Sequence, residues 1–152
     1  MIPLSLAILA LNALVSVQSP ATNHAPLFNG TWTADIARST MNVRVKASTL
    51  DFVVTADTVS ITDHVTSLTN QEQGYGTTTF RTDGQPHPHD ELMPGLVAVA
   101  IWRSDRQLET VLTRSDGLID RVTYEVSQDG RSLLLRSTGN LGSQVIFFNR
   151  TP

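Results

Sequence analysis

The sequence predicts an all-β protein: a single up-and-down antiparallel β-barrel of about eight to ten strands, similar in class to the lipocalin barrels. Three observations predict it. Thr, Val, Ser and Leu dominate, and long runs of Ala, Glu and Lys are absent, a composition that suits a pleated sheet. Short segments alternate between apolar and polar residues, and turn residues separate them at regular intervals. At 152 residues the chain has room for one domain.

The first 21 residues are predicted to be a signal peptide. Residues 4–17 form an apolar run that is shorter and more polar than the roughly 20 residues that span a membrane. Ser19 and Ala21 follow as a small-x-small cleavage signal. We expect cleavage after Ala21, which leaves a barrel domain of residues 22–152 that is periplasmic or secreted.

An alternative interpretation of this segment is a short buried N-terminal helix. It rests on the first three residues, which carry no positive charge, whereas a secretory signal normally begins with one.

The expected strands follow one another through the rest of the chain. Period-two alternation is clear where Leu50, Phe52 and Val54 alternate with polar residues. The segment 96–102 is almost entirely apolar, which predicts a strand covered on both faces. Only residues 35–41 are compatible with a helical turn in this part of the sequence. The expected strands are residues 30–34, 50–55, 59–65, 75–82, 96–102, 108–114, 118–127, 132–138 and 144–150.

Short turns join these strands. Asp83-Gly84 and Asp129-Gly130 are strong turn dipeptides, because glycine and aspartate tolerate a left-handed backbone. Tight turns between successive strands predict a meander, and closure of the meander removes its exposed edges. A barrel of this size encloses one small ligand or a plug of side chains.

Charge and composition exclude several classes of function. The formal net charge is −3, and no segment clusters the ten arginines and one lysine. No nucleic-acid partner is therefore expected, nor stable membrane insertion after signal removal. The chain has no cysteine, which excludes disulfides and thiolate metal sites. No catalytic motif is visible, so we expect neither an enzyme nor a cofactor.

Two residues of the first strand are predicted to build the closed end of the barrel. Gly30 lets the chain enter where a Cβ would clash, and Trp32 buries a large ring there. The run Phe28-Asn29-Gly30-Thr31-Trp32 resembles the opening of the calycin proteins, the lipocalins and fatty-acid-binding proteins, and above all small bacterial lipocalin-like domains. The Asp83-Gly84 turn with its Pro-containing loop and the turn 127–130 match that pattern as well. The resemblance extends over most of residues 28–150.

The resemblance implies a role for an arginine near the last strand. In lipocalins such an arginine lies over the tryptophan ring, and here Arg150 or Arg136 is the candidate for this cation–π contact. The resemblance also implies an exported binding protein that holds a small hydrophobic or amphipathic molecule in the barrel.

Four residues of the late strands are predicted to contact that ligand: Arg103, Arg114, Arg136 and Tyr124. A guanidinium group inside a barrel matches the carboxylate of an anionic head group, as in the fatty-acid-binding branch of the family. The alternative is that these arginines face water, because arginine is rarely buried.

The loop of residues 83–95 supports a second hypothesis. His87 and His89, followed by Asp90 and Glu91, suggest zinc or copper ligation. The prolines around them indicate a solvated loop at the barrel rim instead, so we predict no metal site. If the barrel is packed solid, this loop is the expected contact surface of a protein-interaction or inhibitor module.

Overall fold

The computed structural model describes residues 23–74 and 76–152. The predicted signal peptide lies outside these residues. They form ten strands, a four-residue helix α1 (Ala25–Phe28) and a 3-10 turn η1 (Ile36–Arg38). The strands are β1 (Gly30–Ala34), β2 (Ala47–Val54), β3 (Thr58–Thr66), β4 (Gly76–Arg81), β5 (His87–Pro88), β6 (Val97–Ser104), β7 (Gln107–Arg114), β8 (Gly117–Val126), β9 (Ser132–Gly139) and β10 (Gly142–Arg150).

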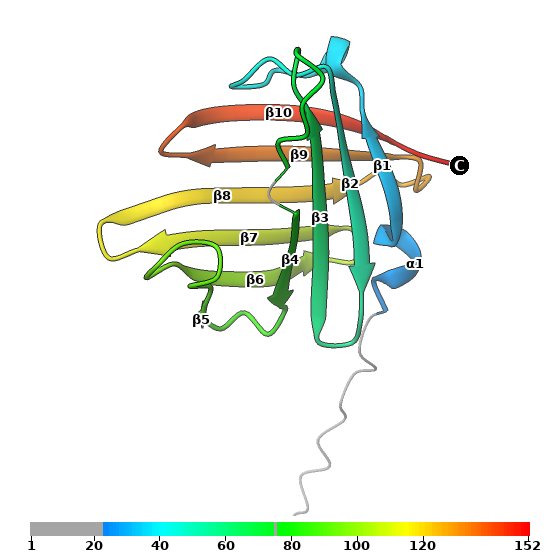
Figure 1. Cartoon of the computed structure of the whole chain (residues 1–152). Helices are drawn as coiled ribbons and strands as arrows, with labels where there is room; N and C mark the ends of the chain where they lie inside the picture. The colour runs from blue at the N-terminus through cyan, green and yellow to red at the C-terminus, as the bar shows by residue number, and fades with distance from the viewer. Residues whose placement is uncertain (1–22, 75) are drawn as a thin grey trace, which may run out of the picture.

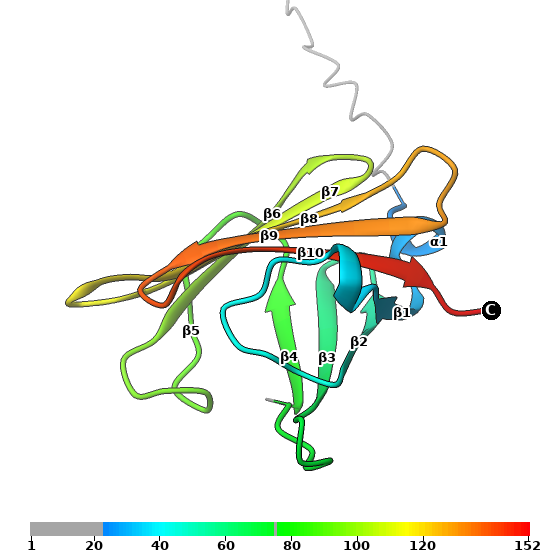
Figure 2. The same cartoon turned by 90° about the horizontal axis from the view of Figure 1, so that it is seen from above.

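All the strand pairs are antiparallel, and the strands form one sheet in the order β4-β3-β2-β1-β10-β9-β8-β7-β6-β5. The prediction of an all-β, up-and-down barrel is confirmed. The sheet folds over on itself, so that β1–β4 cross in front of β6–β10 (Figure 1). The view from above shows the same two layers enclosing the interior between them (Figure 2).

Closure of the barrel is nearly complete. After β4 the chain turns at Asp83-Gly84, where Asp83 bridges Ile101 and the Gly84 N–H donates to the Ala100 carbonyl at 3.0 Å. It then runs along the edge of β6 as β5. The segment predicted as a rim loop therefore contains a short edge strand, and residues 89–96 form a loop at the rim that is closed by a hydrogen bond from the His89 N–H to the Leu96 carbonyl at 2.8 Å.

The apolar core lies at one end of the interior. Alternation puts Leu50, Phe52 and Val54 of β2 on the buried face, as the period-two pattern predicts. The strands β8 and β9 contribute in the same way. The fully buried side chains gather around Trp32, Phe28, Phe52, Phe148, Leu108 and Leu133.

One prediction about a strand is wrong. The apolar segment that forms β6 is not covered on both faces: its buried positions are Ala98 and Ala100, while Val97 and Val99 on the other face are partly exposed. The continuous apolar run arises because the inward positions hold small residues and the outward ones are β-branched, not because a second layer covers the strand.

Candidate functional site

The closed end of the barrel, here called the floor, is built around Trp32. The Trp32 ring is completely buried, and its Nε1–H donates to the Phe28 carbonyl at 2.9 Å. The Arg150 guanidinium lies over the ring with its Cζ 4.1 Å from the centroid. Gly30 has φ +120°, a backbone conformation that favours glycine, and a Cβ there would lie 3.4 Å from an Arg150 nitrogen.

Arg150 also ties three backbone segments together. It donates to the carbonyls of Gly130 at 2.8 Å, Asn29 at 2.7 Å and Leu27. Burial lowers the pKa of this arginine. The fork of the guanidinium thus holds α1 and the β8–β9 turn to the end of β10, which fixes the floor as a rigid plug.

Helix α1 places a second aromatic ring under the barrel. Phe28 packs edge-on against Trp102 with ring centroids 4.9 Å apart and contacts Phe52 at 5.8 Å. Phe52 in turn meets Tyr124 edge-on at 5.4 Å. This aromatic chain fills the floor half of the interior, and ring pairs of this geometry add to the burial of their area.

Tyr124 marks the boundary between the packed and the polar halves of the interior. Its side chain is buried, and its hydroxyl group forms a hydrogen bond with the Thr110 side chain. Burial, and after it the negative charges of Asp120 and Asp63, raise the pKa of Tyr124 far above its ordinary value. The hydroxyl is therefore a neutral polar group in the folded protein.

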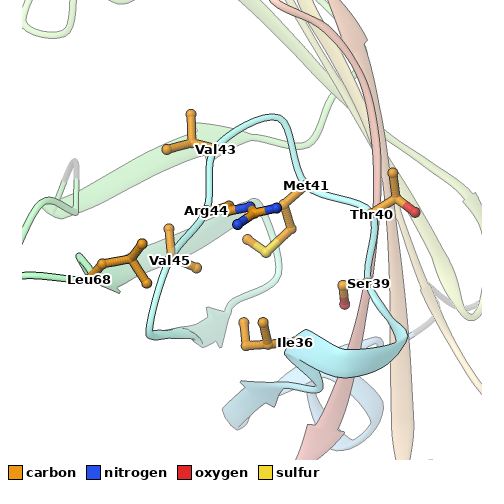
Figure 3. Close-up of a pocket in the computed structure, with 8 residues that line it drawn as sticks. All are labelled: Ile36, Ser39, Thr40, Met41, Val43, Arg44, Val45 and Leu68. Carbon is orange, nitrogen blue, oxygen red and sulfur yellow. The ribbon is translucent and has the colours of Figure 1, made fainter.

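The opposite end of the barrel, here called the mouth, contains a pocket. The pocket has a volume of about 490 Å³ and opens between the β1–β2 connection and the β3–β4 connection. Figure 3 shows the Met41 side chain directed into the pocket and Ile36, Val45 and Leu68 around it. The remaining lining residues are Ser39, Thr40, Val43 and Arg44.

The mouth pocket is held by a chain segment of residues 35–46. Its first half is fixed against β10: Ser39 Oγ accepts from the Phe147 N–H at 3.0 Å, and Thr40 bridges Val145. Its end is fixed to β3, where the Lys46 N–H donates to the Thr66 carbonyl at 2.8 Å. Between these anchors residues 41–45 cross the mouth from one layer to the other (Figure 2).

The three predicted ligand-binding arginines do not meet inside the barrel. Arg103 lies on the outer face and pairs with Glu109 at 2.7 Å, and Arg136 pairs with Glu125 at 3.4 Å on the same face. Arg114 lies at the rim, where Asp116 at 2.5 Å raises its pKa. Among the four predicted residues, Tyr124 is the one that faces the interior, and Arg136 does not reach Trp32.

The two histidines of the predicted rim loop point to different surroundings. His87 Nε2 lies 2.9 Å from an Asp83 carboxylate oxygen in a partly exposed position. His89 is buried against the Phe80 ring with centroids 5.3 Å apart, and its Nδ1 lies 2.7 Å from Glu91. Within residues 23–74 and 76–152, no group of three or more His, Cys, Asp or Glu side chains is placed to hold a metal ion.

Sequence reasoning missed the residues of the mouth pocket. Ile36, Met41, Val45 and Leu68 lie in two connections far apart in the sequence, and nothing in the sequence marked these connections as neighbours. The available signal was composition: the segment 41–45 carries three large apolar side chains outside any strand, which is unusual for a solvated loop.

The structure resembles several solved structures. The wild-type fluorescent protein UnaG is 13% identical with a TM-score of 0.58, and the match covers 84% of this chain and 99% of that one. A Schistosoma mansoni fatty-acid-binding protein in complex with arachidonic acid is 14% identical with a TM-score of 0.62, covering 86% and 100%. The fatty acid transporter REP1-NXSQ is 12% identical with a TM-score of 0.58, covering 82% and 96%.

At these identities the likeness shows the fold alone, which is that of the calycin barrels. No family model matches the sequence, and no curated protein matches it. No helix within the described residues is long and apolar enough to cross a membrane.

Proposed function

We propose that this calycin barrel binds a small hydrophobic or amphipathic molecule in the mouth half of its interior. The observation that carries the proposal is the contrast between the two ends of the barrel: the floor is filled with aromatic side chains, whereas the connections at the mouth form an open pocket of about 490 Å³. Pockets of this volume suit small-molecule ligands. The fold neighbours support the proposal, since a fatty-acid-binding protein and a fatty acid transporter share the architecture.

The lining of the pocket explains how such a ligand gains affinity. Ile36, Met41, Val45 and Leu68 present apolar surface, and removing it from water contributes about 25 cal/mol per Å². The Ser39 hydroxyl and the Thr40 backbone hold the segment against β10, so these two residues position the pocket.

The direct test is native mass spectrometry of the purified protein, followed by titration with the hydrophobic fluorophore ANS. We expect a co-purified small molecule, or enhanced ANS fluorescence that an alkyl alcohol displaces. A clean protein that leaves ANS fluorescence unchanged contradicts the proposal.

A pair of substitutions locates the site. Val43 and Leu68 are 66% and 63% exposed and line the pocket, so the double variant Val43→Ser/Leu68→Ser should bind ANS several-fold more weakly and keep its free energy of unfolding within about 0.5 kcal/mol. The matched control is Val53→Ser, which changes a 58% exposed valine on the outer face of β2. Equal loss of ANS binding in the control would place the site elsewhere.

A second candidate function is a protein-interaction or inhibitor module that uses the rim. Exposed aliphatic side chains of the rim favour it, because Leu92 and Met93 of the 89–96 loop and Leu141 of the β9–β10 turn all face solvent. Replacing residues 90–93 with glycine and serine should abolish capture of a protein partner while ANS binding persists. Unchanged capture would eliminate the rim loop as the contact surface.

We also propose that the chain is exported and that residues 1–21 are removed on the way. The apolar run with its small-x-small end supports this proposal. Intact mass measurement of the protein from a secreting host tests it: a chain that begins at Thr22 supports export, and a full-length chain in the cytosol opposes it.

A further inference from the structure

The proposed cleavage leaves a histidine close to the new N-terminus. Without residues 1–21 the chain begins Thr22-Asn23-His24, so that His24 is its third residue. A chain of this kind can place its α-amino nitrogen, the amide nitrogens of its second and third residues and the histidine Nδ1 around one metal ion, in consecutive chelate rings. A planar set of nitrogen donors is the arrangement that Cu²⁺ and Ni²⁺ favour among the divalent metals.

The backbone nitrogens of this segment are free. Within the described part of the chain, neither the Asn23 N–H nor the His24 N–H donates a hydrogen bond. The hydrogen bonds at the start of α1 use other atoms: Asn23 Oδ1 accepts from the Ala25 N–H at 3.1 Å, and the His24 carbonyl accepts from the Phe28 N–H at 3.2 Å. A metal can therefore bind the two amide nitrogens without taking a donor from the helix.

The His24 side chain lies at the floor with its Nδ1 in an exposed contact. Its ring stacks on Trp102 with centroids 3.8 Å apart and an interplanar angle of 7°. The Nδ1–H donates to the Asp105 carbonyl at 3.1 Å in an exposed position, where water competes for the same bond. His24 occupies the N-cap position of α1, but its side chain does not cap the helix, and Ser, Thr, Asp or Asn is favoured there. The helix therefore does not require a histidine at this position.

We propose that the mature chain binds one Cu²⁺ ion at its N-terminus, through the Thr22 amine, the amide nitrogens of Asn23 and His24, and His24 Nδ1. This inference rests on the proposed removal of residues 1–21 and goes beyond the proposed ligand binding. Binding releases one proton from the α-ammonium group and one from each amide, and the Nδ1 proton moves to Nε2. Ni²⁺ takes the same site less tightly, whereas Zn²⁺ favours a tetrahedral set of ligands and does not compete.

This metal site lies beside a tryptophan and away from the mouth pocket. Trp102 contacts both His24 and Phe28, and α1 lies at the opposite end of β1 from η1, which lines the pocket with Ile36 (Figure 1). A paramagnetic Cu²⁺ ion bound by His24 should therefore quench the fluorescence of Trp102. The two sites are separate, so the binding of ANS at the mouth should not change.

The test uses the mature protein from a secreting host, after intact mass measurement has established its first residue. Titration with copper(II) chloride should saturate at one equivalent, with a visible absorption band and quenched Trp102 fluorescence, and equimolar Zn²⁺ should not reverse it. His24→Phe keeps an aromatic ring against Trp102 and lacks Nδ1. One additional serine before Thr22 keeps His24 and moves it to the fourth position. Each change should abolish the absorption band.

The matched control is His64→Ala, which removes a half-exposed histidine of β3 and should leave the copper titration unchanged. A chain that begins at Thr22 and binds no Cu²⁺, or one that keeps the absorption band with the additional serine, overturns the inference and leaves the proposed export intact. Loss of the band in His64→Ala also overturns it. A mature chain that begins at another residue overturns the proposed cleavage and this inference together.

Discussion

The floor of this barrel is built by its strands and α1, whereas the pocket at the mouth is built by the connections between strands. At the floor Trp32, Phe28 and Phe52 leave little or no surface exposed, and Arg150 ties the chain ends around them. At the mouth Val43 and Leu68 stay more than half exposed. One end of the barrel thus buries its apolar side chains, and the other leaves apolar surface exposed.

This contrast distinguishes the residues that we expect to determine stability from those that we expect to determine ligand affinity in a small barrel without disulfides. A domain of this size has only about 5–15 kcal/mol of net stability, so the packed half must supply most of it. Substitutions at the floor should therefore change the free energy of unfolding, and substitutions at the mouth should change ligand affinity.

The largest expected effect is that of Trp32→Ala. Loss of a completely buried indole ring, with its hydrogen bond to Phe28 and the contact with Arg150, should lower the free energy of unfolding by about 3–5 kcal/mol. Urea denaturation measures it. The matched control, Val43→Ala at the mouth, should stay within about 0.5 kcal/mol. Comparable losses in both variants would abolish the contrast between the two ends.

Arg150 and Arg136 test whether an arginine of the floor differs from one of the outer face. Arg150→Ala leaves three carbonyl acceptors without their donor and removes the cation–π contact, so we expect a loss of about 2 kcal/mol. Arg136→Ala breaks one exposed ion pair with Glu125 and should cost less than about 0.5 kcal/mol. Thermal unfolding of both variants in parallel measures the two losses of stability. Equal losses would contradict a special stabilising role for Arg150 in the floor.

The smallest effect concerns Tyr124 at alkaline pH. Its pKa is raised in the folded state, above the ordinary value of 10.0, so folding favours the neutral phenol. The unfolded chain releases this proton once the pH exceeds 10.0 and the folded chain does not, so stability falls as the pH rises through that value. Tyr124→Phe should show a shallower decline in denaturation curves above pH 10.0. Parallel declines in the two proteins would indicate that Tyr124 ionises freely in the fold.

The sequence predicts the floor better than it predicts the mouth, and the reason is physical. Gly30 and Trp32 lie on a strand, where period-two alternation and the glycine position carry information about burial. The mouth pocket brings Met41 together with Leu68 from two connections that lie between different pairs of strands. Their proximity depends on where β10 and β3 anchor the segment 35–46, which only the assembled barrel determines.

The arginines also show what a single sequence does not predict. Alternation assigns Arg121 and Arg136 to the outer face once the register is known, and both pair there with glutamates. Next to Arg114, however, the pairing of β7 with β8 passes from Leu112–Asp120 to Thr113–Leu118, so β8 carries one extra residue, Ile119. A bulge of this kind changes the face that the following side chains of β8 occupy, and single-sequence patterns do not reveal it.

The most direct test of the account is an NMR titration of the isotope-labelled protein with 1-decanol. We predict shifts at Met41, Val45 and Leu68 that saturate with ligand, while the Trp32 indole N–H signal, protected in the floor, stays in place. Shifts that begin at Trp32 and leave the mouth residues unchanged would contradict the division of this barrel into a packed floor and a ligand-binding mouth.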